Sequence, residues 1–113
     1  SGPRSMELLV MGLGGCTAMD VAFILRRHRQ PFSGLEVFVN AERADTHPQV
    51  FTRIHIEYVV YGDVSEKAVQ RAIHLSETKY CSASAMFGKT ATITNSYHII
   101  KNGRPEDIAI PSE

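Results

Sequence analysis

The sequence of 113 residues contains only two cysteines and no excess of charge of either sign. The two cysteines, Cys16 and Cys81, are too few for the disulfide framework of a small secreted domain. Twelve basic and twelve acidic side chains cancel, which argues against a protein that binds nucleic acid by neutralising phosphates. We therefore expect a cytoplasmic protein with two free thiols and no nucleic-acid partner.

Long hydrophobic runs are lacking as well. The longest uncharged stretch of the first helical segment, residues 8–19, has 12 residues, whereas a membrane span needs about 18 or more. No basic segment followed by an apolar one opens the sequence, so we expect neither a membrane span nor a signal peptide. With 43% hydrophobic and 21% charged residues, the chain has the composition of a single globular domain over residues 1–113.

Residues 6–25 predict one long helix that is apolar on both faces. A helix without a polar face is expected to be buried on all sides. Gly12, Gly14 and Gly15 fall in its middle, where each glycine costs about 1 kcal/mol relative to alanine. We expect these glycines to allow the close approach of another backbone.

Two segments that alternate apolar and polar residues, 35–42 and 53–60, predict strands joined by a turn at 45–48. We expect them to form an antiparallel hairpin with one solvent-facing side. Asp63 and Glu66 have the spacing of a capping box and predict a second helix that ends at residue 80. The apolar stripe of this helix consists of Val69, Ala72, Ile73, Ser76 and Tyr80.

A further helical turn is predicted at 82–87, ended by Gly88, and a third strand at 90–100. Residues 102–103 are typical of a turn, and residues 105–113 of a loose C-terminal tail. The order of helix, two strands, helix and strand indicates an α+β fold. Three strands and one short helix cannot cover the first helix on all sides. We therefore expect a partner chain to cover it, sheet-forming sequence before Ser1, or both.

The two cysteines are the main candidates for chemistry. A free cysteine often packs as a small hydrophobic side chain, and that interpretation holds for Cys16 and Cys81 taken singly. Alternatively, the neighbouring glycines leave space for a small substrate to reach the Cys16 sulfur. A reactive thiol is a thiolate and needs a nearby cation, which no residue close in sequence supplies. As a pair the cysteines suggest a redox couple, although their separation of 65 positions leaves their proximity open.

The five histidines show no spacing typical of metal ligands, so we predict no metal site. They are His28, His47, His55, His74 and His98. Residues 12–15 are rich in glycine but apolar, and they lack the lysine and the preceding strand of a phosphate-binding loop.

Three segments together resemble the OsmC/Ohr family of thiol-dependent peroxidases: residues 6–9 (Met-Glu-Leu-Leu), 14–16 (Gly-Gly-Cys) and 75–81 (Leu-Ser-Glu-Thr-Lys-Tyr-Cys). The resemblance covers about residues 2–100 and is nearest to the YhfA-like branch. It implies an OsmC-like α+β domain, in which a long buried central helix packs with an antiparallel sheet in an intertwined homodimer. The N-terminal strands of the family are expected to be lacking from this chain.

The same resemblance implies the chemistry. Cys16 corresponds to the peroxidatic thiol of the family, and Cys81 corresponds to its resolving thiol. Members of the family reduce organic hydroperoxides with electrons from dithiols, lipoyl-linked dithiols included. They use no metal, haem or flavin, so we expect no cofactor here.

The chain departs from the family at two positions. The resemblance implies that the activating arginine of the family belongs to an N-terminal strand region, which we expect to lie before this sequence. Met6 takes the place of the glutamate that pairs with the arginine, and Glu7 lies one position further on. An offset of one residue rotates a helical side chain by about 100°, so Glu7 is not an equivalent replacement. We therefore expect a less activated thiolate and slower turnover.

The leading hypothesis is an organic hydroperoxide reductase that works through a Cys16/Cys81 couple in oxidative stress defence. Two alternatives stay open: a noncatalytic, stress-associated binding domain in which the thiols only pack, and a thiol redox sensor. A site lined by Met6, Val10, Leu13 and Tyr80 would be apolar. Such a site would favour organic hydroperoxides over hydrogen peroxide, because hydrogen peroxide is costly to dehydrate.

Overall fold

The structure, a computed structural model, describes residues 5–46 and 48–101, with side chains in the first helix described from residue 8 onward. His47, the predicted turn at 102–103, the predicted tail at 105–113 and the side chains of Met6 and Glu7 lie outside this description. The elements in chain order are α1 (Ser5–Arg27), β1 (Phe32–Arg43), β2 (Phe51–Gly62), α2 (Glu66–Leu75), the π-helix η1 (Ser76–Tyr80), α3 (Ser82–Phe87) and β3 (Thr92–Ile100).

The three strands form one sheet in the order β1-β2-β3. β1 and β2 pair antiparallel, which confirms the predicted hairpin, whereas β3 runs parallel to β2. The sheet is therefore mixed, and the expectation of a wholly antiparallel sheet is wrong. The reason is the connection after β2, because α2, η1 and α3 carry the chain back to the start of β2, the crossover that a parallel pair requires.

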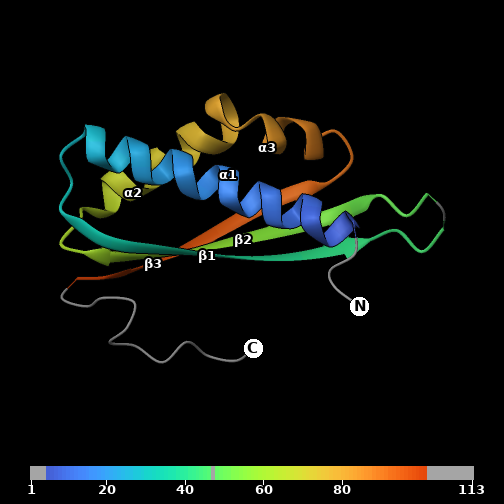
Figure 1. The fold of residues 1–113 in the computed structure, drawn as a ribbon, viewed down its shortest axis with the longest axis horizontal. Coiled ribbons are helices and arrows are strands. Elements are labelled where there is room, and N and C mark those ends of the chain that lie inside the picture. Colours follow the sequence, from blue (N-terminus) through green and yellow to red (C-terminus); the bar gives the residue numbers. More distant parts are fainter. Residues whose placement is uncertain (1–4, 47, 102–113) are drawn as a thin grey trace.

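The helices all lie on one side of the sheet, and α1 runs lengthwise along it (Figure 1). The core lies between these two layers. Along β2, Ile54, Ile56, Tyr58 and Val60 are buried, and the residues between them are more exposed. This alternation is the pattern expected for a sheet with one covered face, and the α+β class is thereby confirmed.

Helix α1 is buried on one side only within the single chain. Leu13, Val21 and Leu25 are at most 1% exposed and pack into the core. Large apolar side chains on its other side are between 53% and 75% exposed: Leu8, Leu9, Met11, Met19 and Phe23. The single chain therefore covers only one side of α1, as expected, and burial of the other side stays a prediction.

The length and composition of α1 also meet the usual criterion for a membrane-spanning helix, over residues Leu8–Arg27. The expectation of no membrane-spanning length was based only on the uncharged residues 8–19, which end just before Asp20. The criterion tolerates a few charged residues, and the longer segment Leu8–Arg27 therefore meets it. The core helix of a soluble protein meets the same criterion. In this structure the helix packs along the sheet through its buried side.

Only one of the three glycines in α1 lies against another part of the chain. A Cβ atom on Gly14 would lie 3.0 Å from Cγ2 of Val39, so this position lets α1 approach β1 closely. The atom nearest to Gly14 thus belongs to the Val39 side chain, whereas the expectation from the sequence is the backbone of another segment at these glycines. Gly12 and Gly15 have open space beside them.

The second helical segment differs from its prediction at both ends. Its N-cap is Ser65, whose Oγ accepts a hydrogen bond from the Ala68 N–H at 3.0 Å, and not Asp63. The α-helix ends at Leu75, and the next five residues form η1. This change of pitch leaves Tyr80 55% exposed, so its predicted place in the apolar stripe is wrong.

Candidate dithiol site

The two cysteines lie side by side in the folded chain. Cys16 comes from the middle of α1, and Cys81 from the junction between η1 and α3. Their sulfur atoms are 2.8 Å apart, although 65 positions separate them in the sequence. Both are free thiols, and a disulfide bond of about 2.05 Å would require only a small further approach. The structure thus supplies the proximity that the sequence left open.

The π-helix and the short helix after it fix the position of Cys81. The Cys81 N–H donates to the Ser76 carbonyl at 2.7 Å, which closes η1, and Cys81 is also the N-cap of α3. The Ser84 N–H donates to Cys81 Sγ at 3.4 Å. Cys81 is 3% exposed, while Cys16 is half-buried. Cys16 is therefore the sulfur that a small molecule reaches more easily.

Asp20 is a third member of the site and was missed in the sequence analysis. One of its carboxylate oxygens and the two sulfur atoms all lie within 4.8 Å of one another. Ser76 Oγ donates a hydrogen bond to Asp20 Oδ2 at 3.2 Å. Asp20 follows Cys16 by four positions, a spacing that places both side chains on one face of a helix. That spacing is the signal in the sequence that could have identified it.

The electrostatics of the site favour the neutral thiol of Cys16. Burial is the largest cause that raises the pKa of Cys16, to about 11, followed by the hydrogen bond and the electrostatic interaction with Cys81 and then by the negative charge of Asp20. The Ala83 backbone N–H opposes them. Among the described residues, none of the groups that act on Cys16 is a cation. The cation that a reactive thiolate needs must therefore come from outside these residues.

A hydrogen-bond cluster around Glu77 ties η1 to the sheet beneath it. The Tyr58 hydroxyl donates to Glu77 Oε2 at 2.6 Å, and the Asn95 side-chain amide donates to Glu77 Oε1 at 2.9 Å. Burial and the Glu77 carboxylate together hold the pKa of Tyr58 well above its usual range. Tyr58 therefore remains a hydrogen-bond donor, and η1 is anchored on both β2 and β3.

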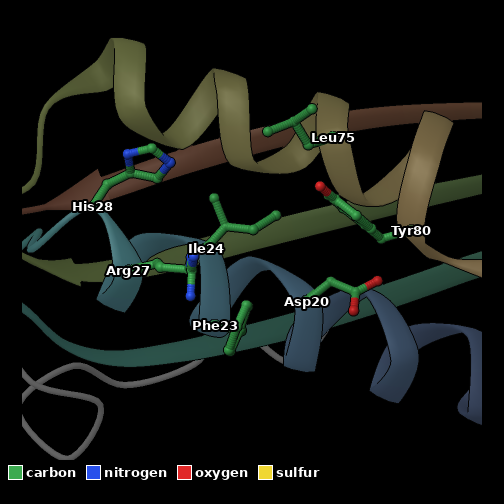
Figure 2. A pocket seen from close by; sticks show the side chains of 7 residues that line it. All are labelled: Asp20, Phe23, Ile24, Arg27, His28, Leu75 and Tyr80. Atoms are coloured by element: carbon green, nitrogen blue, oxygen red, sulfur yellow. The ribbon is translucent and has the colours of Figure 1, made fainter.

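A cavity of about 340 Å³ opens beside the dithiol pair, between α1 and the segment formed by α2 and η1. Figure 2 shows Asp20 and Tyr80 near one end of it and His28 near the other. Asp20 belongs both to this cavity and to the cysteine cluster. The cavity therefore adjoins the site at Asp20, and neither cysteine is among its lining residues. It is lined by Asp20, Phe23, Ile24, Arg27, His28, Leu75 and Tyr80.

The lining of this cavity is more polar than predicted. Of the four residues expected to form an apolar site, Tyr80 lines the cavity, and Leu13 is fully buried and belongs to the core. Val10 packs against the same core. Four titratable side chains line the cavity beside the apolar ones: Asp20, Arg27, His28 and Tyr80. This cavity is therefore not the apolar site predicted around Cys16, and that site stays a prediction because the Met6 side chain lies outside the described part of the chain.

Comparison with known proteins agrees with this architecture. Residues 1–96 match the family model described as OsmC-like protein. Protein YhfA of Escherichia coli strain K12 is 41% identical over 99 residues, which cover 87% of this chain and 74% of that protein. A crystal structure of a hypothetical protein from Aquifex aeolicus superposes with a TM-score of 0.87 at 35% identity, covering 91% of this chain and 78% of the other.

A more distant fold relative is a Legionella pneumophila protein described as an organic hydroperoxide resistance protein OsmC. It superposes with a TM-score of 0.71 at 9% identity, covering 86% of this chain and 70% of that one. Together, the fold and the site define an α+β protein with a long helix laid on a sheet and a pair of adjacent thiols. The chain belongs to the OsmC-like family.

Proposed function

We propose that this protein is a thiol-dependent peroxidase that reduces organic hydroperoxides through Cys16 and Cys81, in defence against oxidative stress. The observation that carries the proposal is the 2.8 Å separation of two free thiols, one half-buried and one buried. Membership of the OsmC-like family supports it, and so does the description of a fold relative as an organic hydroperoxide resistance protein.

In the proposed reaction, the Cys16 thiolate attacks the outer oxygen of the hydroperoxide. The S–O bond forms as the O–O bond breaks, and the departing alkoxide takes up a proton to leave as an alcohol. Cys16 is then a sulfenic acid. The Cys81 sulfur displaces its hydroxyl group as water, which forms the Cys16–Cys81 disulfide. A dithiol reductant, lipoyl-linked dithiols included, restores both thiols and becomes a disulfide itself. A reducing compartment such as the cytoplasm supplies such dithiols.

The test is consumption of cumene hydroperoxide by the reduced protein with dihydrolipoamide as the reductant. We expect Cys16→Ser to abolish turnover. Cys81→Ser should consume one equivalent of peroxide and leave a sulfenic acid on Cys16 that dimedone labels. Thr94→Ala is the matched control, since Thr94 lies beside His55 on the solvent-facing side of the sheet. Unchanged turnover in Cys16→Ser would refute the proposal.

A thiol redox sensor is the second candidate, and the raised pKa of Cys16 favours it. A thiol with a pKa of about 11 is almost entirely protonated at neutral pH and reacts slowly with peroxide. A sensor requires one oxidation event and no sustained turnover. Stoichiometric disulfide formation without continued consumption of peroxide, in the presence of excess dihydrolipoamide, would identify this function instead.

We also propose that the protein is a homodimer in which a second copy covers the exposed side of α1. Five large apolar side chains on that side are more than half exposed, and the open space beside Gly12 and Gly15 allows close helix contact. An obligate interface of this kind buries roughly 2,000 Å² or more.

Light scattering at micromolar concentration tests the dimer. We expect Met19→Glu, at a residue 75% exposed on α1, to give monomers. Met86→Glu is the matched control, because Met86 is 73% exposed but lies on α3. A wild-type monomer, or a monomer that sediments with phospholipid vesicles, would show that no second copy covers this side.

A further inference from the structure

The geometry points to a transition-metal site formed by Cys16, Asp20 and Cys81, which binds one Zn²⁺ or chemically similar soft divalent cation per chain. The three donor atoms, two sulfurs and one carboxylate oxygen, all lie within 4.8 Å of one another. Thiolate sulfur selects zinc-like ions over magnesium or calcium. The inference concerns metal binding and does not depend on the proposed peroxidase activity.

The backbone already places the donors at nearly the separation that a metal ion requires. Zinc binds thiolate sulfur at about 2.3 Å, so two sulfurs in a tetrahedral site lie about 3.7 Å apart. The sulfurs of Cys16 and Cys81 are 2.8 Å apart, so they would have to separate by about 1 Å. Cys16 lies on α1 and Cys81 at an element junction, so rotation about the side-chain bonds can supply this movement.

The surroundings of the cluster resemble the supporting contacts of metal sites. Ser76 Oγ donates to Asp20 Oδ2 at 3.2 Å, which orients the carboxylate toward the sulfurs. The Ser84 N–H donates to Cys81 Sγ at 3.4 Å, a contact that stabilises a thiolate ligand. Asp20 and Cys81 therefore each already have a hydrogen-bond partner besides the other members of the cluster.

The cluster is also accessible. Cys16 and Asp20 are half-buried, and Asp20 lines the cavity between α1 and the α2–η1 segment. A metal ion can enter there, and water can occupy the fourth coordination position. Three protein ligands with one open position are the arrangement of a site that exchanges ligands, unlike the closed four-ligand sites of structural zinc.

Metal binding and disulfide formation exclude each other at this site. Binding one divalent ion converts both thiols to thiolates and releases two protons, one from each sulfur. The same two sulfurs are consumed when the disulfide forms. A bound ion would therefore protect the cysteines from oxidation, and oxidation would prevent the ion from binding.

The experiment uses Co²⁺ as a spectroscopic probe on the full, reduced chain under argon. We expect one Co²⁺ per chain, with thiolate-to-metal charge-transfer absorption and the visible bands of tetrahedral Co²⁺, and complete displacement by one equivalent of Zn²⁺. Zn²⁺ added to weakly buffered protein should release two protons per chain. It should also slow alkylation of both cysteines by iodoacetamide at least about tenfold. No peroxide is present, so failure here is distinguishable from failure of the peroxidase proposal.

The variants separate this site from adventitious binding. Cys16→Ser and Cys81→Ser should each remove the tetrahedral Co²⁺ spectrum, and Asp20→Asn should weaken Zn²⁺ binding at least about tenfold. The matched control is Asp63→Asn, at an exposed aspartate whose carboxylate lies 3.8 Å from the Lys101 ammonium. Equal affinity in wild type and Asp20→Asn would overturn the proposal. So would one ion for every two chains, or a Co²⁺ spectrum that survives the loss of either cysteine.

Discussion

Replacement of Asp20 by asparagine should lower the pKa of Cys16. The Asp20 carboxylate is one of the groups that raise this pKa to about 11, because its negative charge opposes a second negative charge on the nearby sulfur. Asparagine has almost the same size and can still accept the hydrogen bond from Ser76 Oγ. The substitution therefore removes the charge and keeps the packing.

The size of the effect follows from the separation of the two groups. Two unit charges 4.8 Å apart, the upper limit for the Asp20 oxygen and the Cys16 sulfur, interact by about 0.9 kcal/mol in bulk water. That energy corresponds to a decrease of about 0.6 in the pKa. Both side chains are half-buried, so the local dielectric constant is below that of water and the decrease should be larger. The fraction of Cys16 thiolate at neutral pH should rise about fourfold or more.

The assay is the pH profile of iodoacetamide alkylation in a Cys81→Ala background, where Cys16 is the one remaining cysteine. The pKa is taken from the midpoint of the profile, with and without Asp20→Asn. Asp63→Asn in the same background should leave the midpoint unchanged, since Asp63 lies in the turn after β2. A midpoint that stays constant or rises in Asp20→Asn would refute the electrostatic role assigned to Asp20.

Three further predictions concern stability. Tyr58→Phe should lower the free energy of unfolding by about 2 kcal/mol in urea denaturation, because it removes a part-buried hydrogen bond to the charged Glu77 carboxylate. A change below about 0.5 kcal/mol would contradict the anchoring of η1. Gly12→Ala should stabilise the isolated chain by about 1 kcal/mol through helix propensity. Gly14→Ala should stabilise the chain less than Gly12→Ala, or destabilise it, because its Cβ would lie 3.0 Å from Val39 Cγ2. Equal changes in melting temperature for the two variants would contradict the close packing of α1 on β1 at Gly14. Oxidation to the Cys16–Cys81 disulfide should stabilise the chain by up to about 4 kcal/mol, because it closes a loop of 65 positions in the unfolded state; equal melting temperatures with and without dithiothreitol would contradict this.

Much of the fold could be predicted because burial leaves a periodic trace in the sequence. The alternation in residues 53–60 reflects the burial of Ile54, Ile56, Tyr58 and Val60 against the helices, and the strand itself extends further at both ends. The direction of β3 leaves no such trace, since its period is the same whether it runs parallel or antiparallel to β2. Only the route of the helical crossover decides it.

The candidate site could be predicted only in part, and the reasons differ between its residues. The cysteines could be named from the sequence, but their approach to 2.8 Å depends on where α1 and η1 cross, which no local pattern encodes. Asp20 could have been paired with Cys16 from helical spacing, whereas its hydrogen bond to Ser76 joins residues 56 positions apart. Tyr80 was misplaced because the amphipathic pattern was continued at the α-helical period into a π-helical segment.

That π-helical segment determines how the position of Cys81 responds to deletion of a residue. A π-helical turn accommodates more residues than an α-helical turn, because its hydrogen bonds reach from residue i to residue i+5. Loss of one residue from Ser76–Tyr80 would therefore remove the extra residue and let the α-helix continue, with Cys81 still directed toward α1. Loss of one residue from α2 has no such compensation and would rotate everything after it by about 100° about the helix axis. Cys81 would then face away from α1, even though every side chain at the site was unchanged. The number of residues in α2 is therefore as much a determinant of the dithiol pair as the identity of any one of them.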